Sequence, residues 1–267
     1  MGPRYIIEAF LGKGSTGEVY KAYDKELASP VAIKLVGPGL TELTSKIRCF
    51  NREALVAEKV SHPNILRIHE VGRINDVAFI SMPYVDGEDL YRRLRRKGRL
   101  SIDESVTIAR QLCGALAAAH AKAVVHCDLK PQNILIDKLD NIYVSDFGTS
   151  KLFEKDGSTD TKDRDRFLYT GDYAAPEQIL GKAVDQRVDV YALGLIIYEM
   201  TTGRTPFSGF CSVDGMLKRL NEKPKLPEKS NPDLPKYIVR AIMGCLEREP
   251  EQRFQSATEV LAVLEGE

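Results

Sequence analysis

The residue pattern of this chain changes at one place, the segment Pro83–Gly87, and that change limits the folds that the chain can adopt. About the first 80 residues alternate apolar and polar side chains and are rich in β-branched residues, which predicts strands. From Gly87 onward apolar residues recur at helical spacing. We therefore expect an α+β architecture. Residues 1–82 would form a small β lobe, residues 83–87 a hinge and residues 88–267 a larger helical lobe.

The periodicity also places individual elements. One helix, near Ser45–Val60, is expected to interrupt the strands. Ser101 followed three residues later by Glu104 predicts a helix start, because each side chain can satisfy a free backbone N–H of the first turn. That helix should run to about Lys122, and Ser256 with Glu259 predicts a second start of the same kind. The expected strands are Tyr5–Leu11, Glu18–Tyr23, Val31–Val36, Leu66–Val71 and Val77–Met82.

The bulk composition excludes several kinds of partner. A chain of 267 residues suits one two-lobed domain or two small ones. Its 38 lysines and arginines balance 38 aspartates and glutamates, so no global field would attract nucleic acid or an anionic membrane. The longest apolar stretch, Val190–Met200, is too short to span a bilayer. We expect no nucleic-acid partner and no membrane segment.

The cysteines indicate a reducing environment. Their number is odd, they are scattered and no C-x-x-C pair occurs, so neither a disulfide framework nor a zinc site is indicated. A reducing, intracellular setting fits this usage, and we expect a cytoplasmic chain. The five positions are Cys49, Cys113, Cys127, Cys211 and Cys245.

A glycine-rich loop spans residues 12–17, with Gly12, Gly14 and Gly17 in G-x-G-x-x-G spacing. Glycines let backbone N–H groups approach phosphate oxygens without a Cβ clash. Dinucleotide-binding folds use the same spacing but continue into a helix. Here Glu18–Tyr23 continues as a strand, which favours a phosphate-binding hairpin, with an ordinary glycine-rich turn as the alternative.

A lysine follows in the middle of the third expected strand, in V-A-I-K at residues 31–34. Burying the amine of Lys34 is costly unless it is paired. The next helix offers Glu53 as the partner, whereas we expect Glu58 to face solvent. Paired in this way, Lys34 could hold the α- and β-phosphates of a nucleotide. Two unrelated surface charges are the alternative.

Three further motifs follow in order: H-C-D-L-K-P-Q-N at 126–133, D-F-G at 146–148 and A-P-E at 175–177. With the glycine loop and V-A-I-K, they make the chain resemble the eukaryotic-like (Hanks-type) protein kinases. The resemblance extends to Arg253. Sequence segments such as S-H-P-N-I-L at 61–66 look most like those of bacterial members of the family. It implies a bilobal kinase fold, with a β-rich N-lobe carrying one regulatory helix. It also implies transfer of the γ-phosphate of Mg-ATP to serine or threonine hydroxyls of proteins.

The resemblance assigns roles to these residues. Asp128 would accept the proton of the substrate hydroxyl, Lys130 would neutralise the γ-phosphate, and Lys34 with Glu53 would hold the other phosphates. Asn133 and Asp146 would bind Mg²⁺, with Mn²⁺ as a substitute, because both offer hard oxygen ligands. The expected ATP contacts are Leu11, Gly12, Gly14, Gly17, Val19, Ala32, Lys34, Met82, Pro83, Val85 and Leu135.

The resemblance also implies three structural contacts. Phe147 would pack against the helix that carries Glu53. Glu177 would pair with Arg253. Asp189, on a buried helix, would anchor the catalytic loop.

The chain departs from the family pattern in its catalytic loop, where Cys127 stands in place of the usual arginine. That arginine normally holds a phosphate on the activation segment, residues 146–177. We therefore expect activity that does not depend on phosphorylation of this segment or that is controlled by other means. Cys127 itself is interpreted as an inert small residue, with a redox role as the alternative. Tyr169 replaces the usual glycine before Thr170, and Gln132 does not support a preference for arginine-rich substrates.

Other functions remain as alternatives. A catalytically weak or inactive kinase domain acting as an ATP-binding scaffold would be expected to lack Lys34, Asp128 or Asp146, and all three are present. The A-P-E segment argues against a small-molecule kinase, and Lys130 followed by proline argues against a tyrosine kinase. The basic run at 92–99 either recognises an acidic partner or forms a solvated helix face. Additional domains and a homodimer stay open.

Overall fold

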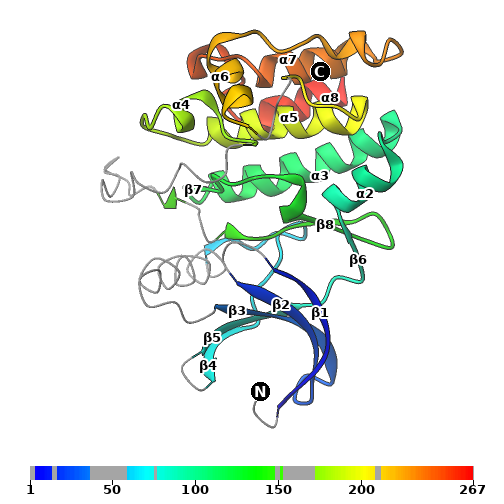
Figure 1. The fold of residues 1–267 in the computed structure, drawn as a ribbon, viewed down its shortest axis with the longest axis vertical. Helices are drawn as coiled ribbons and strands as arrows, with labels where there is room; N and C mark the ends of the chain where they lie inside the picture. The colour runs from blue at the N-terminus through cyan, green and yellow to red at the C-terminus, as the bar shows by residue number, and fades with distance from the viewer. Residues whose placement is uncertain are drawn as a thin grey trace.

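The computed structural model describes residues 4–13, 17–36, 59–74, 77–147, 151–152, 172–207 and 212–266. Within these ranges the chain forms a β-sheet region from its N-terminal part and a helical region from its C-terminal part (Figure 1). The two regions are joined by the short stretch that follows Pro83. The expected α+β architecture is confirmed.

The N-terminal sheet has five antiparallel strands, in the order β1-β2-β3-β5-β4. Alternate residues of β3 face opposite sides of the sheet. Ala32 packs in one apolar cluster with Ala78, Ile80 and Met82, whereas Ile33 packs in another with Tyr5 and Phe79. The strands are β1 (Tyr5–Lys13), β2 (Glu18–Asp24), β3 (Ser29–Val36), β4 (Glu70–Ile74) and β5 (Val77–Pro83).

The fourth strand begins later than the pattern predicts. The expected strand Leu66–Val71 is wrong at its start, because β4 covers Glu70–Ile74. The residues before it bond elsewhere: the backbone N–H of Leu66 donates to the oxygen of Val144 at 2.9 Å. The expected helix Ser45–Val60 lies outside the described residues except at its end, where Lys59 is helical.

The C-terminal region is built around α5, which lies between α3 and α7 (Figure 1). All residues of α5 are buried except Arg187 and Glu199, so this helix forms the centre of the main apolar core. The helices are α2 (Leu90–Lys97), α3 (Ile102–His120), α4 (Pro176–Ile179), α5 (Arg187–Thr202), α6 (Val213–Asn221), α7 (Lys236–Cys245) and α8 (Ala257–Glu265). Across the described ranges, no helix combines the length and the apolar character needed to cross a membrane.

Short strands also occur in this region, which the helical pattern from Gly87 onward did not predict. β6 (Gly87–Asp89), β8 (Ile134–Asp137) and β9 (Ile142–Val144) form a three-stranded sheet, and β7 (Val124–Val125) pairs with β10 (Lys151–Leu152). Gly87 sits so close to β8 that a side chain there would collide with the backbone of Ile136. These strands frame the loop that carries the H-C-D motif.

Helix α3 begins where predicted, and the Glu104 N–H donates to Ser101 Oγ at 3.2 Å, which is the Ser101 half of the predicted reciprocal pair. The helix ends at His120, slightly earlier than expected. The Glu104 carboxylate accepts hydrogen bonds from Arg93 Nη1 at 3.1 Å and Lys97 Nζ at 2.8 Å. The Glu104 side chain therefore pairs with the basic run, and only its backbone N–H takes part in the helix cap.

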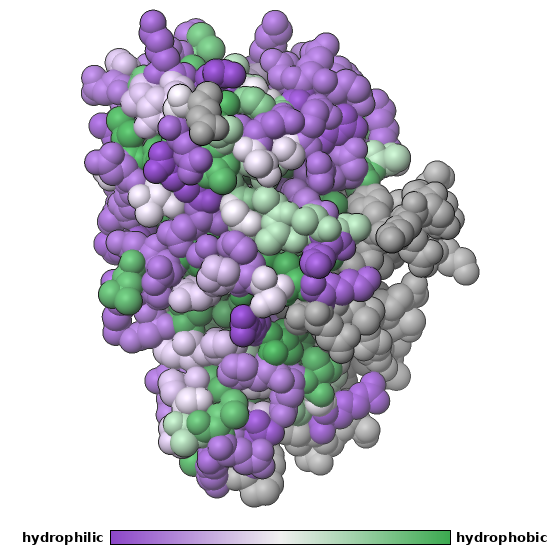
Figure 2. Space-filling view, turned by 180° about the vertical axis from the view of Figure 1, so that it is seen from behind, coloured by the Kyte–Doolittle hydropathy of each residue, from purple (hydrophilic) through white to green (hydrophobic). Residues whose placement is uncertain are grey.

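Much of the basic run at 92–99 is neutralised within the fold. Arg93 is buried and contacts three carboxylates, those of Glu88, Glu104 and Asp140. Arg96 pairs with Glu88 at 2.5 Å. Much of the rest of the surface is hydrophilic as well, as Figure 2 shows for one face. This pairing favours an ordinary charged helix face over a docking site for an acidic partner.

We expect Gly194→Ala to lower the free energy of unfolding by about 1–3 kcal/mol, because its new methyl group would lie 2.5 Å from Cys245 Cβ on the neighbouring helix. Gly114→Ala is the matched control in α3. The nearest atom to its methyl group is a His62 ring carbon at 3.5 Å. Because alanine favours a helix over glycine, this variant should gain about 0.5–1 kcal/mol. Urea unfolding measures both, and equal effects would contradict the packing argument.

Candidate active site

The H-C-D loop joins β7 to β8 and brings three of the expected site residues together. Lys130 Nζ donates to Asp128 Oδ2 at 2.8 Å. Asn133 Nδ2 donates to the backbone oxygen of Asp128 at 2.9 Å, and the N–H of Asn133 donates to the oxygen of Lys130. A carboxylate, an ammonium group and an amide are thus held in one loop, with the Asp128 side chain 12% exposed.

Asp189 on α5 anchors this loop, as the resemblance implied. Its Oδ2 accepts from the His126 N–H at 2.8 Å, and its Oδ1 accepts from the Cys127 N–H at 2.9 Å. His120 Nε2 lies 2.8 Å from Oδ2, a contact that the sequence did not reveal. Burial acts to raise the pKa of Asp189, but its hydrogen bond with His120 and the N–H of His126 keep that pKa below the ordinary range.

The ring of His126 links the loop to the D-F-G segment. Its Nδ1 accepts from the Asp128 N–H at 3.2 Å, so the ring proton is on Nε2, which donates to the backbone oxygen of Ser145 at 2.9 Å. The Phe147 ring lies 4.6 Å from the His126 ring. The expected contact of Phe147 with the helix carrying Glu53 lies outside the described residues. The sequence marked His126 as part of a motif but gave it no role.

Asp146 connects the loop to the N-terminal sheet through an ion pair with Lys34 Nζ of β3. The Lys34 side chain is 5% exposed, so the pairing offsets the cost of its burial. Burial acts to raise the pKa of Asp146, but the charge and hydrogen bond of Lys34 hold it below the ordinary range. The expected partner of Lys34, Glu53, lies outside the described residues.

The expected nucleotide contacts come from both parts of the chain. Leu11 and Val19 pack against the apolar cluster that contains Ala32 and Met82, and Ala32 lies opposite Met82 in the strand register. Gly12 and Gly17 are the first and last residues of the glycine loop, and Gly14 lies outside the described residues. Pro83 and Val85 follow Met82 along the chain, and Leu135 lies on β8.

Asn133 and Asp146 offer oxygen atoms of the kind that bind a magnesium ion. Within the described ranges no group of three or more His, Cys, Asp or Glu side chains could hold a metal. Mg²⁺ commonly binds through only one or two protein ligands, with phosphates and water completing its shell. Asn133 and Asp146 lie on segments joined by a hydrogen bond from the Ser145 N–H to the Asn133 oxygen at 2.9 Å. Because the Asn133 nitrogen bonds to Asp128, its side-chain oxygen is the atom available to a cation.

The end of the activation segment is fixed by a buried ion pair. Arg253 Nη1 donates to Glu177 Oε1 at 2.8 Å, which confirms the pairing that the resemblance implied. The same guanidinium lies 4.9 Å from the Tyr191 ring centroid of α5. These contacts hold α4 against the helical core.

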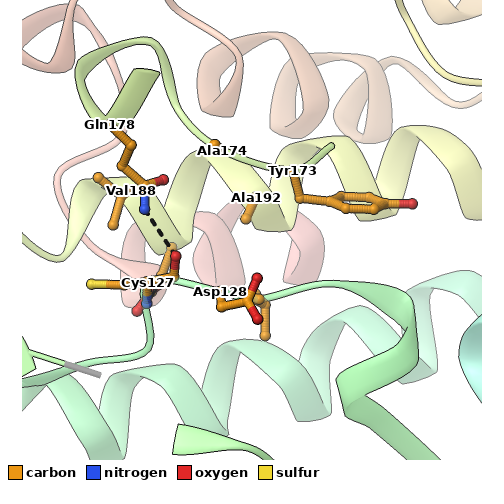
Figure 3. Close-up of a pocket in the computed structure, with 9 residues that line it drawn as sticks. Cys127, Asp128, Tyr173, Ala174, Gln178, Val188 and Ala192 are labelled. Atoms are coloured by element: carbon orange, nitrogen blue, oxygen red, sulfur yellow. Dashed lines mark hydrogen bonds between the residues drawn. The ribbon is translucent and has the colours of Figure 1, made fainter. Parts of the chain in front are cut away.

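Gln178 is a site neighbour that sequence reasoning missed. Its Nε2 donates to the backbone oxygen of Cys127 at 2.8 Å (Figure 3). The sequence did contain a signal. A proline at the first position of a helix, followed two residues later by a glutamine, indicates a helix start, and the glutamine side chain can accept a hydrogen bond from the N–H of the residue before the proline. The bond to the Cys127 oxygen could not be predicted from the sequence, because the two residues lie far apart along the chain. The cavity is lined by Cys127, Asp128, Leu129, Tyr173, Ala174, Gln178, Val188, Asp189 and Ala192.

Several positions of the activation segment fall outside the described residues. They are Gly148, Ser158, Thr159, Thr161, Tyr169 and Thr170.

The sequence of this chain is similar to those of known proteins. The family model described as the protein kinase domain matches residues 5–263. The chain is 36% identical, over 97% of its length and 39% of the relative, to a "probable serine/threonine-protein kinase" of Clostridium acetobutylicum. It is 35% identical to the serine/threonine-protein kinase PrkC of Bacillus subtilis (97% and 40%) and 32% identical to PknB of Mycolicibacterium smegmatis (99% and 43%). The chain spans about two-fifths of the length of these curated relatives.

We expect Asp189→Asn to lower the free energy of unfolding at neutral pH by about 3 kcal/mol, because it breaks up a buried, hydrogen-bonded charge. The folded-state pKa of Asp189 lies below the unfolded value. Its stabilisation is therefore complete above the unfolded pKa of about 3.9 and is lost as pH falls through the folded pKa. Urea unfolding at a series of pH values should show the gap between wild type and variant narrowing only below about pH 4.

The control for this series is Asp86→Asn, whose exposed pair with Lys138 should contribute little. A gap that stays constant down to the acid limit of folding would contradict the role given to the Asp189 charge.

Proposed function

Because this chain belongs to the protein kinase domain family, we propose that it is an active serine/threonine protein kinase that uses Mg-ATP. The observation that carries the proposal is the ion pair between Lys34 and Asp146. It places a cation suited to phosphates beside a carboxylate suited to Mg²⁺. The hydrogen bond between Ser145 and Asn133 joins this pair to the loop of Asp128. The three curated relatives are themselves named as serine/threonine-protein kinases, one of them as a probable one.

In the proposed reaction the substrate hydroxyl attacks the γ-phosphorus of ATP. The new oxygen–phosphorus bond forms as the bond to the β–γ bridging oxygen breaks, and ADP leaves with that electron pair. Asp128 accepts the hydroxyl proton and orients the attacking oxygen. Lys130, whose Nζ is 2.8 Å from Asp128, neutralises charge on the transferring group.

The other residues bind and position ATP. Lys34 holds the α- and β-phosphates, together with Glu53, and Gly12, Gly14 and Gly17 offer backbone N–H groups. Asn133 and Asp146 hold Mg²⁺, or Mn²⁺ as a substitute, and the ion neutralises developing phosphate charge when bound. Val19, Ala32 and Leu135 enclose the adenine, beside Leu11 and Met82. The oxygen of Pro83 and the N–H of Val85 bind its edge, and a proline is tolerated because only its carbonyl is used.

We further propose that activity does not require a phosphate on the activation segment. Cys127 carries no charge with which to bind one, and its side chain is buried. Burial raises the pKa of the Cys113 thiol to about 12, and a buried thiol that stays protonated suits a reducing cytoplasm. The substrates we propose are proteins with accessible serine or threonine residues.

We expect Asp128→Asn to abolish transfer of labelled phosphate from Mg-ATP to casein and to the chain itself. The variant should bind ATP as wild type does, because Asp128 acts on the substrate hydroxyl and not on the nucleotide. Phosphoamino-acid analysis and a nucleotide-binding titration measure the two effects. Nucleotide binding without any transfer in the wild type would instead favour an ATP-binding scaffold.

We expect phosphatase-treated protein to keep its initial rate within about twofold of untreated protein. Combined replacement of Ser158, Thr159 and Thr161 by alanine, which prevents rephosphorylation at these positions, should give the same rate. Mass spectrometry verifies the phosphorylation state. A loss of activity on dephosphorylation that is restored by autophosphorylation would contradict the proposal.

A further inference from the structure

The side chain of Gln178 bridges the end of the activation segment and the catalytic loop. It is 4% exposed. Its Nε2 donates to the Cys127 oxygen at 2.8 Å, and its Oε1 accepts from the Ala175 N–H at 2.9 Å. Figure 3 shows the amide extending from α4 toward the Cys127 carbonyl. A buried amide bonded at both ends keeps one orientation, because loss of either bond would leave a buried polar group unpaired.

The carbonyl that Gln178 binds belongs to the same planar peptide group as the nitrogen of Asp128. Gln178 holds the oxygen of that group, and His126 Nδ1 accepts from its N–H at 3.2 Å. Cys127 has a φ of 65°, in the left-handed region. For a residue other than glycine this conformation costs free energy and persists only where surrounding contacts hold it. The peptide plane that leads into Asp128 is therefore clamped on both sides.

We propose that Gln178 is a positioning residue for phosphoryl transfer, which keeps the Asp128 carboxylate oriented by clamping the Cys127–Asp128 peptide group. This inference rests on the proposed kinase function and extends its account of the activation segment. Where the family pattern has an arginine whose side chain binds a phosphate, residue 127 is held here through its backbone oxygen by a neutral amide. The link between the activation segment and the catalytic loop thus exists without a phosphate.

If Gln178 only stabilised the fold, its loss would have the same effect as the loss of a similar glutamine elsewhere. The helix that carries Gln178 is also held by the Glu177–Arg253 ion pair, so loss of the amide should leave α4 in place. Gln111 of α3 provides a control, because its amide also bridges two backbone groups, and its Oε1 accepts a further hydrogen bond from Asn64 Nδ2 at 2.8 Å. Its Nε2 donates to the Asp140 oxygen and its Oε1 accepts from the Ile142 N–H, both at 3.0 Å. That bridge supports the turn between β8 and β9, not the H-C-D loop.

The test compares Gln178→Met, Gln178→Glu and Gln111→Met in phosphatase-treated chain. Methionine keeps the length of glutamine without its hydrogen bonds. Glutamate keeps an acceptor for the Ala175 N–H but sets a carboxylate oxygen against the Cys127 carbonyl. We expect both Gln178 variants to lower kcat for casein by roughly 10–100-fold, because a displaced catalytic group loses its alignment. Their KM for ATP should stay within about twofold, and Gln111→Met should keep the wild-type kcat.

Amide hydrogen exchange gives a second measurement that does not depend on turnover. Gln178→Met should exchange faster than wild type across residues 126–133 and unchanged across α5. Thermal melts set a temperature at which every variant is folded.

The outcomes separate this inference from the proposed function. Wild-type transfer with an unchanged kcat in Gln178→Met, an equal loss of kcat in Gln111→Met, or unchanged exchange across 126–133 overturns the role of Gln178 alone. Absence of Asp128-dependent transfer in the wild type overturns the proposed function, and the inference with it.

Discussion

The geometry of the site depends on one buried carboxylate. Asp189 projects from α5, the most enclosed helix of the described chain, and receives the backbone N–H groups of His126 and Cys127. Burying a carboxylate without hydrogen-bond partners would cost much free energy. The loop N–H groups therefore stabilise the buried Asp189 on the helix, and Asp189 in turn fixes the loop. Because α5 is packed on nearly all sides, the position of Asp189, which holds the loop, is fixed by the core. The alignment of Asp128 is thus supported by the main apolar core.

From this anchor, hydrogen bonds extend in two directions. Through the His126 ring they reach Ser145, and the next residue, Asp146, pairs with Lys34 of the N-terminal sheet. Through the Cys127 oxygen they reach Gln178 and the end of the activation segment. The H-C-D loop therefore connects the helical core, the sheet and the end of the activation segment. The link through Gln178 is made by a neutral amide, so it depends little on ionic strength.

The sequence predicted the parts of this arrangement that are local. Strand alternation placed Lys34 on β3, the Ser101 cap set the start of α3, and the ordered motifs indicated which side chains share the site. The sequence did not predict features that depend on contacts between residues far apart along the chain. Leu66 was assigned to a strand by its apolar neighbours, yet its N–H bonds to Val144. Arg93 reads as one charge in a basic run, yet it is buried against three carboxylates that the fold assembles. The partners of His120 and Gln178 likewise lie far along the chain, where no local pattern could point.

Gly87 has a consequence for how the two parts of the chain can move. It lies against the backbone of β8 so closely that only a glycine fits, and β6 pairs there with Asp137. The C-terminal end of the connection is thus part of the helical region, just as Pro83 is part of the sheet. Along this connection, a change of angle between the sheet and the helices must be taken up by the backbone torsions of Tyr84, Val85 and Asp86. This connecting segment is three residues long. Its middle residue is Val85, whose N–H is proposed to bind the adenine edge.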